Sequence, residues 1–454
     1  MDISTLVNKQ RQYFLSGITR PYEFRKDALI RLKAAIKANE NQINKALLDD
    51  LNKPESESYM CEIGIIYDEI RYHLKHLHKW MKNKKVHTPV SQFWSKSFVS
   101  PEPYGVALIM SPWNYPVQLC LLPLIGAISA GNCAVVKPSA YAPNVSNVLV
   151  KIISEIFPKE YVSVVEGGRN ENVALLEQKF DIIFFTGSVA VGKTVMASAA
   201  KHLTPVILEL GGKSPVIVDE SADIEVAARR IAFGKILNAG QTCVAPDYVF
   251  VQKKIKDKFV QCFCKAVREF FPNGDMSDLP HIINDKHFAR IKRLMENEKV
   301  LMGGRMDESI RLIEPTILDN VTFDSAIMQE EIFGPILPLI EYESIDTCIS
   351  YIQNNPKPLA LYLFTKNREI EKRVLNSCSF GGGCINDTII HLATPHMGFG
   401  GVGESGMGAY HGKLSFEAFS HLRSIVKKHF VPDLAMRYRP YKKSNDKLIR
   451  SFLK

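Results

Sequence analysis

The sequence predicts an α/β fold with two doubly wound domains and a small β arm. Three observations predict it: strands and helices alternate from residue 104 to 210, they alternate again from 216 to about 384, and an extended segment at 86–103 follows a helical start. Repeated β-α-β units imply parallel sheets with helices on both faces, because parallel neighbours need crossover connections. A chain of 454 residues is also too long for one hydrophobic core.

The chain begins with helices. Residues 2 to about 84 are rich in Leu, Ile, Ala, Lys and Glu, and apolar side chains such as Leu29, Leu32 and Ile36 recur at helical spacing. The amino-acid composition changes at 86–103, where Thr, Val, Ser and aromatic residues are bounded by prolines. This segment predicts an extended hairpin or arm.

The first alternating series consists of short β-branched runs, each followed by a helical segment. We expect strands at 106–110, 134–137, 161–165, 181–185 and 206–210, with helices across 116–130, 144–157, 171–177 and 191–201. In open parallel sheets, ligands bind beyond the carboxyl ends of the strands. A binding site is therefore expected at that edge.

A second series starts at Val216–Val218, after a hinge expected at Gly211-Gly212. Its helices are expected near residues 223–237, 256–271, 345–353 and 368–377. A glycine-rich stretch at 395–412 then suits loops that pass close to a ligand or a partner.

Charge is concentrated at the end of the chain. The net charge is +9, and the segment from Arg437 to Lys454 holds seven basic residues and one acid, Asp446. A solvated tail explains this best, while a weak electrostatic contact with nucleic acid or an anionic membrane stays open. The rest of the chain is nearly neutral, so nucleic acid is not expected as the main partner.

The cysteine pattern and the N-terminus indicate a cytoplasmic protein. Nine cysteines, an odd number, show no CxxC pair and no Cys/His spacing typical of zinc, so no metal site is expected. The N-terminus lacks the apolar core of a signal peptide. The most apolar stretch, Val117 to Ala130, is shorter than the ~20 residues that span a bilayer, so no stable membrane anchor is expected.

Two glycine patterns could bind phosphate. Gly401-x-Gly403-x-x-Gly406 matches the dinucleotide pattern, but it lacks a β-α-β context and is interpreted as a flexible loop. The segment Gly187 to Thr194 matches GxxxxGK[ST] and lies between a predicted strand and a predicted helix. A P-loop NTPase is therefore an alternative, although free N–H groups at a helix N-terminus favour phosphate in either case.

Five further motifs occur in order along the chain, each ambiguous when taken alone. They are Asn114 in SPWNYP, FTGS at 185–188, Glu209 in LELGGKSP, Cys243 in GQTCVAPD and EEIFGP at 330–335. Together they resemble the aldehyde dehydrogenase superfamily over residues 20 to about 428. The length, the helical start and the ending MGAYHGKLSFEAFSH are most similar to its class 3 branch, which is dimeric and NAD(P)-dependent.

The resemblance implies a covalent mechanism. Cys243 would attack an aldehyde to form a thiohemiacetal, and the Asn114 side-chain amide with the Cys243 backbone N–H would stabilise its oxyanion. Glu209 would activate the water that hydrolyses the resulting thioester, and the flanking Leu208 and Leu210 indicate a carboxyl with a raised pKa. A thiol esterase using Cys243 and Glu209, or a non-catalytic binding protein, are further alternatives.

The cofactor residues follow from the same resemblance. Lys137 would lie near the adenosine ribose, the turn with Gly187, Ser188 and Gly192 at the pyrophosphate, Glu331 on the nicotinamide ribose, and Phe333 beside the nicotinamide. Relatives that prefer NAD commonly carry Glu three residues after the lysine, whereas this chain has Ala140. Ala140 neither accepts from the ribose hydroxyls nor repels a 2′-phosphate. We therefore expect NADP to be used as well as NAD.

Substrate and assembly are the last expectations. Tyr115, Phe233 and Leu237 match positions that line the aldehyde channel in class 3 relatives, and no arginine among them would hold a second carboxylate. Medium-chain aliphatic or aromatic aldehydes are expected as substrates of a homodimer. The expected organisation is a Rossmann-like cofactor domain at 1–84 and 104–210, a catalytic domain at 211–392, bridging elements for oligomerisation at 85–103 and 393–430, and a basic tail at 431–454.

Overall fold

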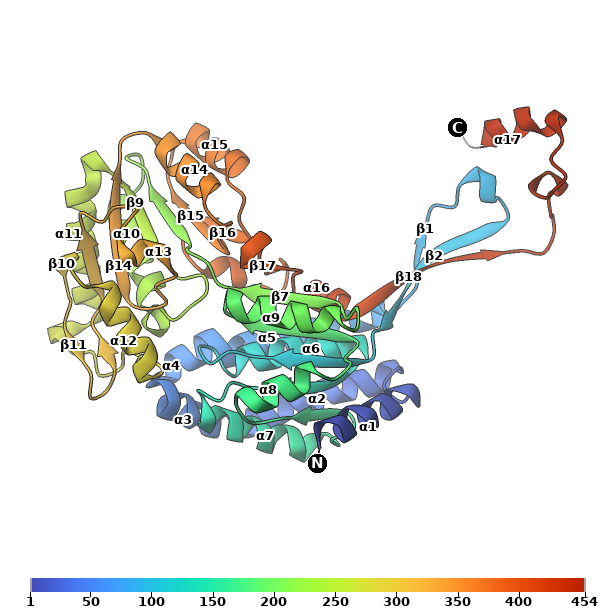
Figure 1. Ribbon diagram of the computed structural model, residues 1–454, viewed down its shortest axis with the longest axis horizontal. Helices are drawn as coiled ribbons and strands as arrows, with labels where there is room; N and C mark the ends of the chain where they lie inside the picture. Colours follow the sequence, from blue (N-terminus) through green and yellow to red (C-terminus); the bar gives the residue numbers. More distant parts are fainter. Residues whose placement is uncertain (1, 453–454) are drawn as a thin grey trace.

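Two α/β bodies lie side by side, and a narrow β arm projects from one of them. The computed structural model describes residues 2–452. Figure 1 shows the N-terminal helices and the first sheet together, the second sheet with its helices beside them, and the arm pointing away from both. The α/β fold with two doubly wound sheets is confirmed.

The N-terminal region is helical, as predicted. Its helices are α1 (Ile3–Leu15), α2 (Tyr22–Ala38), α3 (Glu40–Leu51), α4 (Glu55–Ser58) and α5 (Gly64–Trp80). A π-helical turn at Tyr59–Ile63 joins α4 to α5, which the sequence did not reveal. The predicted apolar face of α2 packs inward, because Leu29, Leu32 and Ile36 are fully buried.

The first sheet has the strand order β17-β7-β6-β3-β4-β5. Its strands are β3 (Val106–Met110), β4 (Cys133–Lys137), β5 (Val162–Val164), β6 (Ile182–Gly187), β7 (Val206–Leu210) and β17 (Gly406–Met407). Between them run α6 (Gln118–Ala130), α7 (Pro143–Ile156), α8 (Arg169–Leu176) and α9 (Val189–Ala200). The chain runs outward from β3 through β4 and β5, then returns to β6 on the other side of β3, and this reversal creates a crevice after β3 and β6.

The second sheet has the order β10-β13-β14-β9-β8-β15-β16, and only β10 is antiparallel to its neighbour. Its strands are β8 (Pro215–Val218), β9 (Tyr248–Gln252), β10 (Lys299–Met302), β13 (Thr316–Asp319), β14 (Ile336–Tyr342), β15 (Ala360–Phe364) and β16 (Gly382–Ile385). Its helices are α10 (Ile224–Ile236), α11 (Lys256–Phe270), α12 (Asp285–Leu294), α13 (Ala326–Gln329), α14 (Ile345–Asn354) and α15 (Arg368–Ser377). The small hairpin β11 (Met306–Asp307) and β12 (Leu312–Ile313) lies outside this sheet.

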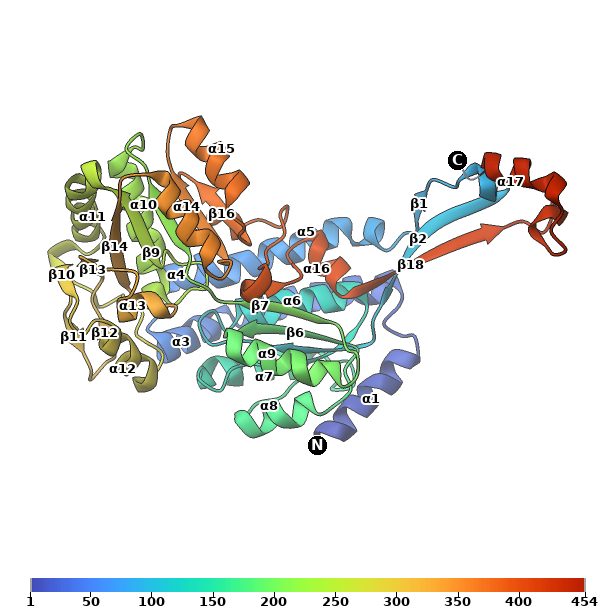
Figure 2. The same cartoon turned by 45° about the horizontal axis from the view of Figure 1, so that its top comes forward.

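The carboxyl ends of the strands in the first sheet face the amino ends of the strands in the second. Strand β7 ends at Leu210 and β8 begins at Pro215, so the chain passes directly from the carboxyl end of one sheet to the amino end of the next. Because β8 is parallel to β9 and β15, their amino ends also face this junction. The loops that enter the second sheet therefore lie opposite the loops that leave the first, as the turned view in Figure 2 illustrates.

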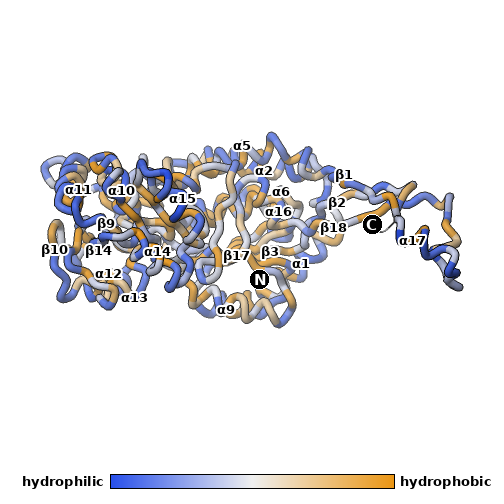
Figure 3. The backbone as a smooth tube through the Cα atoms, turned by 90° about the horizontal axis from the view of Figure 1, so that it is seen from above, coloured by the Kyte–Doolittle hydropathy of each residue, from blue (hydrophilic) through white to orange (hydrophobic). Residues whose placement is uncertain are grey.

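The arm is a three-stranded antiparallel sheet. The predicted hairpin at 86–103 forms β1 (Lys84–Val86) and β2 (Ser95–Pro103), and the unpredicted third strand β18 (Ser420–Lys428) pairs with β2 along nine residues. The helix α16 (Lys413–Ala418) precedes β18, and the short helix α17 (Asp446–Phe452) ends the tail. Figure 3 shows the tail around α17 as largely hydrophilic. None of the described helices is long and apolar enough to cross a membrane.

The glycine pattern at 401–406 differs from its interpretation as a flexible loop. It lies outside any β-α-β unit, as expected, but its last glycine begins β17, which pairs with β7 so that Gly406 stands opposite Glu209. A side chain at Gly406 would contact the carbonyl oxygen of Leu208 at 2.2 Å. The glycines therefore allow this segment to close against the edge of the first sheet.

Candidate active site

Cys243 is presented by a tight turn that leads into β9. Helix α10 ends at Ile236, and Asn238, Ala239 and Gly240 then take left-handed backbone angles, with φ of 52°, 51° and 72°. Such angles are costly for residues other than glycine, so the surroundings must hold them. The backbone N–H of Asn238 donates to Glu57 at 2.8 Å, and the side chain of Gln241 donates to the carbonyl of His281 at 3.0 Å. These contacts fix the turn and with it the sulfur.

Asn114 reaches the same turn from the first sheet. It follows β3, at the crevice where strand order reverses, and it is 3% exposed. Its side-chain nitrogen donates to the carbonyl of Gln241 at 3.0 Å, two residues before Cys243. An amide nitrogen carries two N–H groups, so the second is left for an oxygen bound above the sulfur.

Glu209 lies on β7 with its carboxyl group buried. The residue is 1% exposed, and neither carboxyl oxygen has a partner at good hydrogen-bonding geometry. Burial raises the pKa of Glu209 to about 7, although the nearby Cys243 thiol and Thr186 hydroxyl act in the opposite direction. A carboxyl with this pKa can both accept and release a proton near neutral pH.

The Cys243 thiol holds its proton in the resting protein. Burial and the negative charge of Glu209 raise its pKa well above the usual value. A thiolate is the reactive form of cysteine, so a reaction at this sulfur would need a base to take the proton. Glu209 is a carboxyl group close enough to Cys243 to interact with its thiol.

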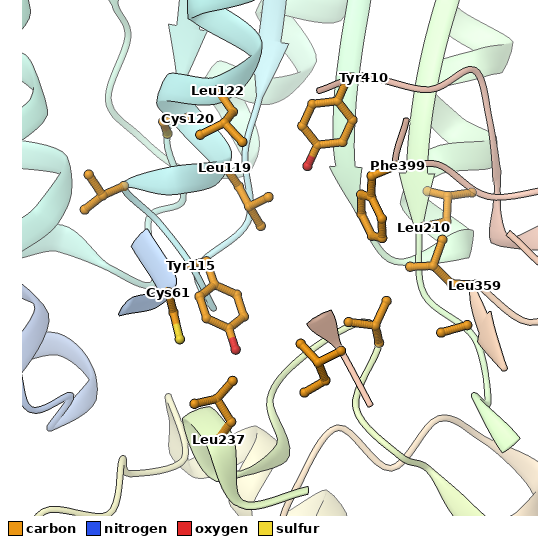
Figure 4. Packing of buried hydrophobic residues seen from close by; sticks show 14 of the residues in the cluster. Cys61, Tyr115, Leu119, Cys120, Leu122, Leu210, Leu237, Leu359, Phe399 and Tyr410 are labelled. Carbon is orange, nitrogen blue, oxygen red and sulfur yellow. The ribbon is translucent and has the colours of Figure 1, made fainter. Parts of the chain in front are cut away.

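Two cavities meet at Cys243, which is the single residue common to both linings among residues 2–452. The first cavity is apolar and is lined by all three predicted substrate residues, Tyr115, Phe233 and Leu237. Figure 4 shows Tyr115 and Leu237 on one side, with Phe399 and Tyr410 facing them from another. The Tyr115 hydroxyl also contacts the Thr242 hydroxyl at 2.5 Å, one residue before Cys243.

The second cavity is more polar and contains most of the predicted cofactor residues. Its lining includes the catalytic candidates Asn114 and Glu209 and the predicted cofactor residues Gly187, Ser188, Glu331 and Phe333. Ser188 caps α9, which begins directly after β6, and a helix N-terminus in this place is the arrangement that binds a phosphate. A side chain at Gly192 would lie 2.6 Å from Leu210, so this glycine lets α9 pack closely on β7.

Glu331 and Phe333 enter the second cavity from the loop before β14. The carboxyl of Glu331 packs where a Cβ on Gly211 would stand, and burial, with the charge of Asp247, raises its pKa to about 8. Such a buried carboxyl is suited to accept from ribose hydroxyls. Phe333 has a left-handed φ of 49° and meets the ring of Trp113 edge-on, with centroids 5.4 Å apart. The lining therefore fits a dinucleotide, with a helix terminus for the phosphates, a carboxyl for a ribose and aromatic rings at the far end.

Lys137 and Gly192 are the predicted cofactor residues that do not line this cavity, and Gly192 instead packs on β7. Lys137 is the side chain whose predicted contact is not formed. It lies at the carboxyl end of β4, as expected, but its ammonium donates to the carbonyl of Pro138 at 2.7 Å, and burial lowers its pKa. Ala140 follows on the exposed segment before α7. The ammonium carries three N–H groups, so the bond to Pro138 leaves two of them for the predicted ribose contact.

Several lining residues were not found from the sequence. Trp113, Thr186, His287 and Arg290 line the second cavity, and the apolar cavity is also lined by Ile389, Ile390, Leu392 and Ala393. Arg290 donates to the carbonyls of Glu331 and Ile332 at 3.0 and 2.6 Å and thereby holds the loop that carries Glu331. Its helix, α12, has the sequence of an ordinary amphipathic surface helix, so no local signal marks Arg290.

The P-loop alternative is not supported by the geometry. In a P-loop, a lysine at the start of the helix reaches the bound phosphates. Here the helix starts earlier, at Val189, and Lys193 is an exposed side chain that pairs with Glu404 at 3.2 Å. The hydroxyl of Thr194 donates to the Ala190 carbonyl of the same helix and is not free for a metal.

A partly buried thiol between an apolar cavity and a cavity that fits a dinucleotide is the arrangement expected of a dehydrogenase that uses a cysteine. Residues 2–425 match the Aldehyde dehydrogenase family, to which this chain therefore belongs. The chain is an NAD(P)-dependent aldehyde dehydrogenase that oxidises aldehydes, and the predictions of family, function and cofactors are confirmed.

Individual relatives are similar along their whole length. The chain is 49% identical over 448 residues to a 4,4'-diaponeurosporen-aldehyde dehydrogenase of Staphylococcus aureus, covering 98% of this chain and 97% of that one. It is 45% identical over 427 residues to the "Aldehyde dehydrogenase, dimeric NADP-preferring" of Mus musculus, covering 94% of each. The substrate-bound state of Staphylococcus aureus AldH superposes with a TM-score of 0.97 at 48% identity, covering 100% of this chain and 99% of that structure.

Proposed function

We propose that Cys243 is the nucleophile of aldehyde oxidation, Asn114 the oxyanion donor and Glu209 the general base. The observation that carries this proposal is that Cys243 is shared by the two cavities, with Glu209 beside its sulfur and Asn114 hydrogen-bonded to its turn. An aldehyde in the apolar cavity can thus meet the sulfur on one side, while the dinucleotide lies on the other.

The first half of the reaction forms a bond from sulfur to carbon. Glu209 takes the thiol proton while the Cys243 sulfur attacks the carbonyl carbon, giving a thiohemiacetal whose oxygen carries the negative charge. The free N–H of the Asn114 amide and the backbone N–H of Cys243 donate to that oxygen. When bound, the nicotinamide ring supplies the hydride acceptor, and the residues that would hold the dinucleotide are Gly187, Ser188, Gly192, Glu331, Phe333 and Lys137.

The second half of the reaction releases the acid. The acyl group now forms a thioester with Cys243, and Glu209, having lost its first proton to solvent, takes a proton from water as that water attacks the thioester carbon. The carbon–sulfur bond breaks, the carboxylic acid leaves and the sulfur is regenerated. The dual role of Glu209 is supported by its pKa of about 7, because both protonation states are populated at neutral pH.

The apolar cavity supports medium-chain aliphatic or aromatic aldehydes as substrates. Apart from Gln118 and His411, its lining side chains are hydrocarbon, aromatic, sulfur-containing or a hydroxyl already paired with Tyr115, and it holds no arginine or lysine for a substrate carboxylate. The Staphylococcus aureus relative is named for an aldehyde of 4,4'-diaponeurosporene, which is consistent with an apolar substrate.

The proposed assembly is a homodimer in the cytoplasm. A relative at 45% identity is named as dimeric, and β18 leaves one edge of the arm unpaired in the described chain, with Leu422 and Val426 about half exposed. All nine cysteines are free thiols, which suits a reducing compartment. We divide the chain as its sheets suggest: a cofactor domain at 1–84 and 104–210, a catalytic domain at 211–392, bridging elements at 85–103 and 393–430, and a basic tail at 431–454.

Formation of NAD(P)H from a panel of aldehydes tests the mechanism. Cys243→Ser abolishes turnover, whereas Glu209→Gln forms reduced cofactor in a single, slowed burst, because the thiol loses its base, and then stalls as a thioester. Cys264→Ser, at a half-buried thiol on α11 away from both cavities, is the matched control and keeps wild-type rates. Steady turnover by Cys243→Ser would remove the nucleophile assignment, and a strong preference for succinic semialdehyde would contradict the substrate class.

A further inference from the structure

A fully buried lysine lies behind Asn114. Lys53 follows α3 and is 0% exposed. Its ammonium donates to the Glu62 carboxylate at 2.7 Å and to the backbone carbonyl of Asn114 at 3.0 Å, and it lies 4.3 Å from the centre of the Tyr115 ring. Burial of a charge is unfavourable unless it is paired and hydrogen-bonded, and all three contacts meet that need.

The partner of Lys53 holds the other end of the same segment. One oxygen of Glu62 binds Lys53, and the other accepts from the backbone N–H groups of Val117 and Gln118 at 2.8 and 3.1 Å. These N–H groups belong to the beginning of α6, where a negative charge is favourable. The Lys53–Glu62 pair therefore fixes both ends of residues 114–118, the connection between β3 and α6.

The Asn114 carbonyl also joins this segment to the turn of the nucleophile. Besides Lys53, it accepts from the side-chain nitrogen of Asn238 at 2.8 Å. Asn238 is the first left-handed residue of the turn before Cys243, and its side chain donates to the Gln241 carbonyl as well, at 3.1 Å. The carbonyl that Lys53 holds is therefore the point where the first sheet contacts the turn that presents the sulfur.

We propose that Lys53 is a positioning residue for the first chemical step. Together with Glu62 it holds the Asn114 backbone so that the Asn114 amide faces the developing oxyanion above Cys243. Lys53 lines neither of the two cavities at Cys243, so it acts through the segment that begins with Asn114 and not by contact with aldehyde or cofactor. This inference rests on the proposed role of Asn114 as oxyanion donor.

Single substitutions do not isolate this role, because removing one partner leaves a buried, unpaired charge that destabilises the fold. The informative variant is the double substitution Lys53→Met with Glu62→Gln. It removes both charges, keeps similar side-chain volumes, and leaves an amide oxygen at position 62 to accept from the start of α6. Its melting temperature is expected near that of the wild type, while the Asn114 carbonyl has lost its ammonium donor.

The pre-steady-state rate of NAD(P)H formation is the decisive measurement. We expect the double variant to form the burst at least tenfold more slowly, with KM for aldehyde and cofactor within twofold of wild type, because a small misplacement of a donor is costly. As a matched control, Lys256→Met breaks an ion-pair cluster with Asp319 and Glu341 beyond the opposite end of β9 and β13. That control lowers the melting temperature and leaves the burst rate unchanged.

Asn114→Ala, alone and combined with the double variant, separates the possible outcomes. If Lys53 acts through Asn114, Asn114→Ala slows the burst by itself, and adding the double variant slows it less than twofold further. A stable double variant with a wild-type burst rate overturns the role of Lys53 while leaving the proposed mechanism intact. A wild-type burst rate in Asn114→Ala overturns the oxyanion role of Asn114 and the inference with it.

Discussion

The two sheets are both doubly wound, yet they offer opposite edges to the reaction. The first sheet contributes residues that follow its strands: Asn114 after β3, Gly187 and Ser188 at the end of β6, and Glu209 near the end of β7. The second sheet contributes residues that precede its strands: Cys243 before β9, and Glu331 with Phe333 before β14. The rule that ligands bind beyond the carboxyl ends of strands therefore describes only the first half of this site.

The difference shows how a site can use an amino edge. Loops that enter strands lack the crevice that strand reversal provides, so the second sheet holds its residues by special backbone geometry and by side chains from elsewhere. The turn before Cys243 is left-handed and anchored by Glu57. The loop with Glu331 is held by Arg290. The first sheet thus provides a crevice through its topology, whereas the second provides loops that are held in place by hydrogen bonds from other segments.

The largest expected effect comes from a substitution in the left-handed turn before Cys243. A Cβ at Gly240 would lie 2.2 Å from the Gly334 carbonyl oxygen, and its φ is +72°. Gly240→Ala therefore shifts the turn and the sulfur, and we expect kcat to fall about 100-fold, the effect of a displacement of about 1 Å. Gly274→Ala is the control, because it has a similar φ of +73° but open space around it. Equal losses of activity in the two variants would contradict the bracing argument.

The pH profile tests the contribution of the first sheet. In its proposed role, Glu209 can act as a base only when it is ionised, and burial raises its pKa to about 7. Below that value, we expect kcat to fall roughly tenfold for each pH unit, while the burst amplitude of NAD(P)H persists. Stopped-flow and steady-state assays from about pH 5.5 to 8 measure both. A flat kcat across this range would exclude Glu209 as the base of thioester hydrolysis.

A charge added after β4 tests whether the first sheet also selects the cofactor. Ala140 is exposed beyond Lys137, where a carboxylate would repel a 2′-phosphate. Ala140→Glu is expected to raise KM for NADP about tenfold and to change KM for NAD less than twofold. Ala140→Gln, of equal size without charge, should leave both constants near wild type. If wild type turns over NAD alone, this account of cofactor choice is wrong.

The smallest expected effect lies in the apolar cavity. Leu237 stands just after α10 and lines this cavity. Leu237→Ala removes about 40 Å² of apolar contact, worth about 1 kcal/mol, so KM for an alkyl aldehyde should rise about fivefold. Leu203→Ala, at a side chain that is 91% exposed, is the control. An unchanged KM in Leu237→Ala would mean that the aldehyde does not use this cavity.

The regular elements could be predicted because their pattern is local. The predicted strands at 106–110 and 206–210 match β3 and β7, and the helix predicted at 368–377 matches α15. Strands β17 and β18 were missed, since their short or polar sequences become strands only through pairing with β7 and β2. A strand that forms only by pairing with a distant segment need not show the alternating hydrophobic pattern of a strand in its own sequence.

Only part of the site could be predicted, because the contacts that hold it together also join segments far apart in the sequence. Resemblance identified the residues that the structure gathers around Cys243, but not those that hold them in place. Lys53 stands in the polar run NKPESES and looks like a surface residue, and its burial appears only when α6 and the Asn114 segment close over it. Arg290 likewise has the sequence context of a solvent-facing helix. The role of a supporting residue depends on contacts with segments far away in the sequence, and the local sequence pattern does not show these contacts.

The shared sulfur between two separate cavities has a consequence for inhibitor selectivity. A molecule bound in the apolar cavity contacts residues such as Phe233 and Phe399, which do not line the second cavity. With the proposed substrate in this cavity, such a molecule would compete with the aldehyde, and its shape can be fitted to these apolar side chains. A nucleotide mimic instead meets the features of the other cavity, where phosphate and ribose impose the same demands on every dehydrogenase that binds them.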